Sequence, residues 1–264
     1  MTKVTREQIL DALNNDRFEL FGQPKWTFGR NTCNTYEVFV DLMLSEDEEP
    51  ILPEAFIPVI EADEELTKKF GSWFLEHAFI DGARLMRDLE MNLTISINIL
   101  AFQANRPEFI ERLTALIEKT GIYNNNLQFE LSEAQPLNAT GIYNLQKLHD
   151  ELGIRLVLSN FGTGYSNIDL LRKLPFDMIE LSKEFTKGIT EYELELKVIV
   201  GILQMAQVLD IDVCAKGIET AEQMELLEEA GFKMGQGFLI GKPLPMDELK
   251  SFICKYADEG NCGK

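Results

Sequence analysis

Short apolar runs typical of buried strands alternate along this chain with longer amphipathic stretches typical of helices. The longer stretches carry apolar residues at helical spacing, and several end at a glycine suited to a helix C-cap. The strands are expected at residues 17–23, 35–42, 93–99, 127–131, 155–159, 178–181, 212–216 and 236–240. Eight strands with intervening helices predict an α/β fold and favour a closed (β/α)8 barrel, although a doubly wound open sheet would show a similar alternation.

The length of the chain fits one such barrel. Its 264 residues, of which 45% are hydrophobic, supply one large core, and no Gly/Pro-rich linker divides them. We therefore expect a single domain over residues 1–258 and a disordered C-terminal tail over residues 259–264.

The formal net charge of −19 argues against partners that need a basic surface. A field of this sign repels nucleic acid and anionic membranes, so neither is expected to bind. The N-terminus lacks the apolar core of a signal peptide, and no segment reaches the length of a membrane span. The four cysteines show no CxxC spacing, which favours reduced thiols over a zinc site or a disulfide framework. We expect a cytoplasmic protein.

Polar residues gather where the expected strands end, which is where the active site of a (β/α)8 barrel lies. They are Glu37, Asn98, Glu130, Glu133, Ser159, Asn160, Glu180, Lys216, Glu219 and Gln236. Carboxylates and an amide oxygen that converge from several strands form the hard-oxygen environment that Mg²⁺ or Mn²⁺ prefers. For any single residue, the alternative is a loop cap or a local ion pair.

Seven motifs at these positions resemble those of a known family. They are FELFGQP, LPEAFIPVIE, ISINILAFQ, LQFELSEA, NFGTGYSNIDLLRKLPFDMIEL, AKGIETAEQ and QGFLIGKPLP. Over about residues 6 to 254 the chain resembles the EAL-domain family, which hydrolyses the bacterial messenger cyclic di-GMP with two divalent cations on a modified TIM barrel. The resemblance implies metal ligands at Glu37, Asn98 and Glu130. It also implies ligand-binding roles for the retained Gln23, Glu133, Glu219 and Gln236.

The chain departs from the family pattern at the metal site. Active members carry two adjacent aspartates before FGTGYS, one of them bridging both metals, and here Ser159 and Asn160 occupy these positions. Two divalent cations about 4 Å apart repel strongly and need anionic oxygens between them. We therefore expect no cofactor, or at most one weakly bound Mg²⁺ or Ca²⁺.

Charges at the family's catalytic positions also differ. Glu180 occupies the position of a catalytic lysine, Lys216 that of a glutamate, and Asp41 that of an arginine that meets the ligand phosphate. Because the expected sixth and seventh strands are neighbours, the exchanged Glu180 and Lys216 could preserve an ion pair. Independent drift of both positions is the alternative. In either case Asp41 disfavours a phosphodiester.

Three functions remain open, and fold alone does not choose among them. The favoured one is a catalytically inactive, degenerate EAL-domain protein that regulates bacterial cyclic di-GMP-type signalling through protein–protein interaction. The alternatives are a metal-independent cyclic di-GMP receptor and an active cyclic di-GMP phosphodiesterase with a rebuilt metal site. We expect a protein partner and doubt that cyclic di-GMP binds. A homodimer through residues 161–177 is also plausible, although the two glycines there are equally explained by a tight turn.

Overall fold

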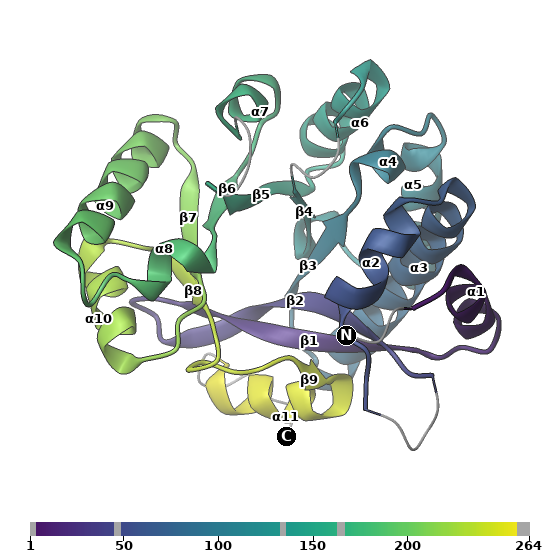
Figure 1. Cartoon of the computed structure of the whole chain (residues 1–264), viewed down its shortest axis with the longest axis horizontal. Helices are drawn as coiled ribbons and strands as arrows, with labels where there is room; N and C mark the ends of the chain where they lie inside the picture. The colour runs from purple at the N-terminus through teal and green to yellow at the C-terminus, as the bar shows by residue number, and fades with distance from the viewer. Residues whose placement is uncertain (1–3, 45–48, 133–135, 163–166, 258–264) are drawn as a thin grey trace.

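The computed structural model describes residues 4–44, 49–132, 136–162 and 167–257. In these residues eight strands form a closed ring with the helices outside it, as Figure 1 shows. The strands are β1 (Phe18–Thr27), β2 (Thr32–Leu42), β3 (Thr94–Ile99), β4 (Leu127–Leu131), β5 (Arg155–Phe161), β6 (Met178–Leu181), β7 (Asp212–Lys216) and β8 (Met234–Gln236). The expected α/β barrel is confirmed, and the open-sheet alternative is wrong because β1 joins β8 to β2.

The first strand makes the barrel a modified one. β1 is antiparallel to both β2 and β8, whereas the ring from β2 to β8 is parallel throughout. The short strand β9 (Leu244–Pro245) pairs with the outer part of β1. Because β1 runs in the opposite direction, its later residues lie deep in the barrel, with Lys25 opposite Thr35 near the start of β2. Their side chains enter the interior from the end opposite to the other strands' carboxyl ends.

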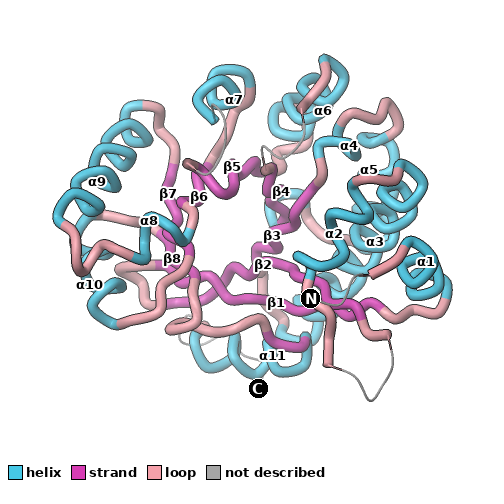
Figure 2. Tube along the Cα trace, in the orientation of Figure 1, coloured by secondary structure: helices cyan, strands magenta, loops and turns pink. Residues whose placement is uncertain are grey.

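Helices cover the outside of the ring (Figure 2). They are α1 (Arg6–Asn14), α2 (Pro53–Glu61), α3 (Glu64–Leu89), α4 (Ala101–Ala104), α5 (Phe109–Thr120), α6 (Ala139–Asp150), α7 (Asn167–Lys173), α8 (Lys183–Lys187), α9 (Glu193–Val208), α10 (Ala221–Ala230) and α11 (Met246–Tyr256), with a 3-10 turn η1 (Asn124–Asn126). Their ends follow from local sequence. Thr220 and Gln223 form a capping box at the start of α10, and Gly121, at a φ of 71°, ends α5.

The core fills the space between the ring and the helices. All five residues of β4 are buried, as expected of a strand covered on both sides. At the end near α1, the rings of Phe18, Phe56 and Phe70 pack edge to face, with centroid separations of 5.3 to 6.1 Å. This packing anchors the start of β1 against α2 and α3.

Some expectations from the sequence need correction. β1 continues to Thr27 instead of ending at 23, and the last barrel strand ends at Gln236, where a turn replaces the strand expected up to residue 240. Cys33 and Cys214 are free and buried, but Cys254 is disulfide-bonded, so the expectation of four reduced thiols is wrong there. The tail at 259–264 lies outside the described residues. None of the helices described is long and apolar enough to cross a membrane.

Candidate active site in the barrel interior

Three glutamates from alternate strands meet inside the barrel. Glu37 lies on β2, Glu130 on β4 and Glu180 on β6, and all three side chains are buried. One carboxylate oxygen of each lies within 4.8 Å of the others. Alternate strands of a (β/α)8 barrel place their inward side chains in a common layer, which explains why residues so distant in sequence come together. Such a triad of carboxylates could hold a metal ion.

Lys216, on the neighbouring strand β7, places its ammonium group among these three carboxylates. Its Nζ lies 3.0 Å from Glu37 Oε2, 3.1 Å from Glu130 Oε2 and 2.7 Å from Glu180 Oε2. The expected contact between Glu180 and Lys216 is therefore present. Lys216 also contacts Glu37 and Glu130. The exchanged charges therefore form more than one ion pair, because a single ammonium group contacts all three carboxylates.

A second ammonium, which the sequence analysis missed, approaches from β1. Lys25 is fully buried, and its Nζ lies 2.5 Å from Glu130 Oε1 and 2.5 Å from Glu180 Oε1. It also donates to Ser96 Oγ at 3.2 Å. Side chains two residues apart in a strand face the same side, so Lys25 faces the same side of β1 as Gln23. This spacing could have predicted Lys25 from the sequence.

We call Lys25, Glu37, Glu130, Glu180 and Lys216 the charged cluster. Three carboxylates and two ammonium groups leave it one negative charge when all five are ionised. Burial alone would lower the pKa values of both lysines, but the carboxylates, Glu130 foremost, outweigh it and raise them, so both stay protonated.

The pKa values of Glu130 and Glu180 shift in opposite directions in this environment. Burial would raise the pKa of Glu130, but Lys216 and Lys25 outweigh that effect and hold it well below its usual value. Burial, together with the charge of Glu130, raises the pKa of Glu180 to about 7. Glu180 therefore holds a proton more readily than Glu130 does.

Two side-chain amide groups also donate hydrogen bonds to the carboxylate of Glu37. Asn98 Nδ2 donates to Glu37 Oε1 at 2.7 Å, and Gln236 Nε2 donates to Glu37 Oε2 at 3.0 Å. Of the metal ligands implied by the resemblance, Glu37 and Glu130 thus share one ammonium, and Asn98 turns its amide N–H, a donor, toward Glu37. The same oxygens that a cation would need already accept bonds from protein donors.

The positions that replace the family's two aspartates differ from each other in burial. Ser159 is buried, and its Oγ has no hydrogen-bond partner within the described residues. Asn160 is exposed and has a φ of 55°, at the point where the register between β5 and β6 shifts. Asn adopts this left-handed conformation more readily than most residues. The backbone here is therefore a bulge carrying two neutral side chains.

Gln23 and the backbone of Glu219 form their hydrogen bonds outside the charged cluster, although Gln23 lies opposite Glu37 in the β1–β2 pairing. Gln23 is buried, and its Nε2 donates to the Gly241 carbonyl at 2.9 Å. Glu219 is exposed in the loop before α10, where its backbone N–H donates to Gln223 Oε1 at 2.8 Å. Glu133 lies outside the described residues. Of the predicted ligand-binding residues that the structure describes, only Gln236 hydrogen-bonds to the cluster.

Asp41 continues the inward face of β2 beyond Glu37, toward the open end of the barrel. Glu19 lies opposite it on β1, and Glu54 lies at the start of α2. Burial and the charges of Glu54 and Glu19 raise the pKa of Asp41 to about 6. Asp41, Glu19 and Glu54 thus form a rim that is acidic at neutral pH.

Comparisons with known proteins agree with this architecture. A family model described as EAL domain matches residues 6–243. The chain is 29% identical over 252 residues to the Cyclic di-GMP phosphodiesterase NbdA of Pseudomonas aeruginosa, an alignment that covers 95% of this chain and 32% of the relative. It spans about a third of the length of the curated relatives it matches first.

Solved structures show the same fold. The EAL enzyme Bd1971, in a form bound to cAMP and cyclic-di-GMP, superposes with a TM-score of 0.88 at 28% identity, over 94% of this chain and 67% of that chain. An EAL domain protein from Listeria monocytogenes EGD-e superposes with a TM-score of 0.83 at 26% identity, over 95% of this chain and 98% of that one.

Proposed function

Because this chain belongs to the EAL domain family, we propose that it is a catalytically inactive member that regulates bacterial cyclic di-GMP-type signalling by binding another protein. The observation that carries the proposal is the ammonium of Lys216, which lies within 3.1 Å of all three glutamates of the triad. We take this ammonium, a cation that the chain itself supplies, to stand in for the family's metals.

Metal binding would have to overcome both lysines. Mg²⁺ needs oxygens at about 2.0 to 2.1 Å in near-octahedral geometry, whereas the triad's oxygens are held by ammonium groups at 2.5 to 3.1 Å. Placing a divalent ion beside Lys25 and Lys216 adds cation–cation repulsion in a buried site. Ser159 and Asn160 contribute no anionic oxygen to offset it. The residues present do not fit the two-metal centre that the resemblance implies.

Without that centre, the barrel lacks the groups that hydrolysis of a phosphodiester requires. A metal pair would activate the attacking water and stabilise the charge that develops on the phosphate, and Lys216 and Lys25 are both engaged by carboxylates. Their protonated state also makes them unsuitable as general bases. Lys25 and Lys216 therefore supply neither the nucleophile nor a base for it.

Binding of cyclic di-GMP is disfavoured by the rim. Asp41, Glu19 and Glu54 present carboxylates where the family has an arginine for the ligand phosphate, so an anionic ligand meets repulsion. The metal-independent receptor stays the alternative; it would need Gln23 and Gln236, whose amide N–H groups donate to the Gly241 carbonyl and to Glu37, to turn toward the ligand. An active phosphodiesterase, as the name of one relative states for that protein, would require a rebuilt site.

A protein partner is supported by the surface of α7 and α9. Ile168, Val208 and Leu209 are 60%, 86% and 48% exposed and border one apolar hollow. Contiguous exposed apolar surface marks protein contact sites. The hollow includes part of the segment for which a homodimer was considered, although residues 163–166 of that segment lie outside the described residues. A second copy of this chain is therefore one possible occupant, and light scattering across a concentration series distinguishes it from a different partner.

Two measurements on the purified protein test the proposal. Cyclic di-GMP incubated with excess Mg²⁺ or Mn²⁺ should not be cleaved above background, and titration calorimetry with and without metal should detect no binding. Hydrolysis that is lost in Glu37→Ala would show a rebuilt active site. Metal-independent heat of binding would instead establish the receptor.

A further inference from the structure

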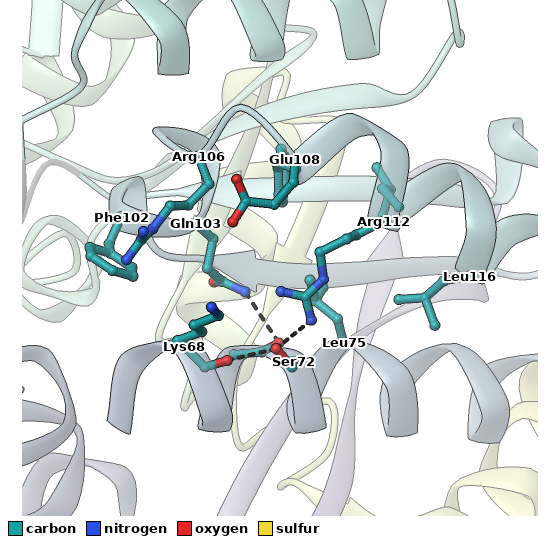
Figure 3. Close-up of a pocket in the computed structure, with 12 residues that line it drawn as sticks. Lys68, Ser72, Leu75, Phe102, Gln103, Arg106, Glu108, Arg112 and Leu116 are labelled. Atoms are coloured by element: carbon teal, nitrogen blue, oxygen red, sulfur yellow. Dashed lines mark hydrogen bonds between the residues drawn. The ribbon is translucent and has the colours of Figure 1, made fainter. Parts of the chain in front are cut away.

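A second site lies outside the barrel, in a hollow between α3 and the α4–α5 segment (Figure 3). We propose that this hollow, which we call the α3–α5 hollow, binds a small amphipathic monoanion, namely a carboxylate attached to an apolar body. The enclosed part of the hollow is small, about 50 Å³, within a space of about 510 Å³ that includes open solvent at its edge, so a bound ligand would lie partly outside the enclosed part. None of its lining residues belongs to the charged cluster, so the proposal is independent of the one above.

Three basic side chains converge on the hollow, in a chain with 44 acidic and only 25 basic residues. Lys68 rises from α3, Arg106 follows α4, and Arg112 projects from α5, as Figure 3 shows. Within the described residues, no carboxylate oxygen lies within 4.0 Å of the charged nitrogens of Lys68 or Arg112. On so acidic a protein, two unpaired cations facing one cavity offer a local site for an anion.

The donors of this site are held in place by neighbouring groups. Arg112 Nη2 donates to Ser72 Oγ at 2.5 Å, and Ser72 in turn donates to the Lys68 carbonyl at 2.6 Å. The guanidinium keeps its other N–H groups for a ligand, in a planar fork that matches a carboxylate. Gln103 closes the wall by donating to the Gly71 carbonyl at 3.2 Å. The anion-binding edge is thus positioned before any ligand arrives.

The charge of the hollow favours a monoanion. Arg106 is neutralised by Glu64 at 2.5 Å and lies over the ring of Phe102, 4.2 Å from its centroid. Glu108 also lines the hollow and faces the basic groups in Figure 3. Lys68 and Arg112 together with Glu108 then leave one positive charge. A single carboxylate balances it, whereas a phosphate dianion would meet the carboxylate of Glu108.

The floor of the hollow is apolar and suits the body of such a ligand. Leu75, Phe109 and Leu113 are buried beneath it, and Leu116 and Phe102 are partly exposed at its sides. Ligand sites commonly combine an apolar floor with a few fixed polar groups that set orientation. An aryl or alkyl chain of a few carbons would cover this floor while its carboxylate meets Arg112 and Lys68.

Calorimetry and ligand-observed NMR with 4-phenylbutyrate test the site, with two analogues as comparisons. The neutral 4-phenylbutanol shares the apolar body, and phenyl phosphate carries a dianion. We expect 4-phenylbutyrate to bind more tightly than both. Equal or tighter binding of the alcohol would overturn the role of the cations, and tighter binding of phenyl phosphate would overturn the monoanion assignment.

Variants locate the binding. Arg112→Gln and Lys68→Gln should each lower the affinity for 4-phenylbutyrate by about tenfold, equivalent to about 1.4 kcal/mol of binding free energy. Lys119→Gln is the matched control, because Lys119 also lies on α5 and is exposed but pairs with Glu76 outside the hollow. Thermal melts confirm that each variant is folded. Undetectable binding to the unmodified protein, or the same affinity in Arg112→Gln as in Lys119→Gln, would refute the site.

Discussion

The contact between Glu180 and Lys216 can be tested by a double-mutant cycle of Glu180→Gln and Lys216→Met. Both changes remove a charge and keep side-chain size. Reversing the charges instead would place a lysine at position 180 against Lys25, whose Nζ lies 2.5 Å from Glu180 Oε1. Each ammonium–carboxylate contact in the cluster has a gross attraction of about 5 to 6 kcal/mol at an effective dielectric constant of 20. Most of this is offset by the desolvation of both charges.

The expected magnitudes follow from what each change leaves behind. Lys216→Met leaves three buried carboxylates with Lys25 alone, and should lower the free energy of unfolding by about 3 to 5 kcal/mol. Glu180→Gln removes one carboxylate from a cluster that carries excess negative charge, so its effect should be smaller. In the double variant the loss should be less than the sum, with a coupling energy of about 2 kcal/mol.

Urea denaturation at pH 8, where Glu180 is mostly ionised, provides the measurement. The control cycle combines Lys216→Met with Lys197→Met. Lys197 lies on α9 and pairs with the exposed Glu193, so the losses in unfolding free energy from these two changes should add. A coupling energy between Glu180 and Lys216 below about 0.5 kcal/mol, within the usual additivity error, would refute the reasoning and favour independent drift of the two positions.

Three further outcomes are expected. The raised pKa of Asp41, about 6 against 3.8 in the unfolded chain, means that the folded state binds more protons between these values and loses stability as pH rises through them. Asp41→Asn should therefore stabilise the protein at pH 7 by about 1 kcal/mol, after a discount for partial exposure, and change little at pH 4; equal effects at both pH values in urea titrations would contradict this. Asn160→Val should destabilise the fold by about 1 to 2 kcal/mol more than Asn160→Gly does, because glycine adopts the positive φ freely and a β-branched residue does not; equal losses would argue against the strained bulge. Excess Mg²⁺ should leave the Tm unchanged relative to EDTA, since an ion at 100 times its Kd would add about 2.7 kcal/mol of stability, and a marked rise would show that the cluster binds metal.

Much of the site could be predicted because β2 to β8 obey the rules of a parallel barrel. Inward residues at the carboxyl ends of such strands converge, so the sequence alone predicts that Glu37, Glu130 and Glu180 belong to one set. The neighbouring positions of β6 and β7 likewise predicted that Lys216 reaches Glu180.

The parts that escaped prediction depend on local exceptions to those rules. The sequence did not point to Lys25 because β1 is antiparallel to β2. The inward residues of β1 enter at the end of the barrel opposite to the carboxyl ends of the other strands, where the polar site was expected. Glu219 was grouped with the site because its loop follows β7; the structure places it in an exposed loop beside the capping box of α10, and its ligand-binding role stays a prediction. Spacing in the sequence does not reveal either effect.

The closed ring also has a consequence for the order in which the chain assembles. Lys25 is separated in sequence from Glu130 by 105 residues and from Glu180 by 155, and Lys216 from Glu37 by 179. During synthesis the hairpin of β1 and β2 emerges first, with both of its buried charges still without partners. Closing such long loops is slow in folding, because chain entropy is lost before the contacts form. Lys25 gains its carboxylate partners only once β4 and β6 have been made, and Glu37 gains its ammonium partner only once β7 has been made. The barrel can therefore seal its interior only in the last stage of folding.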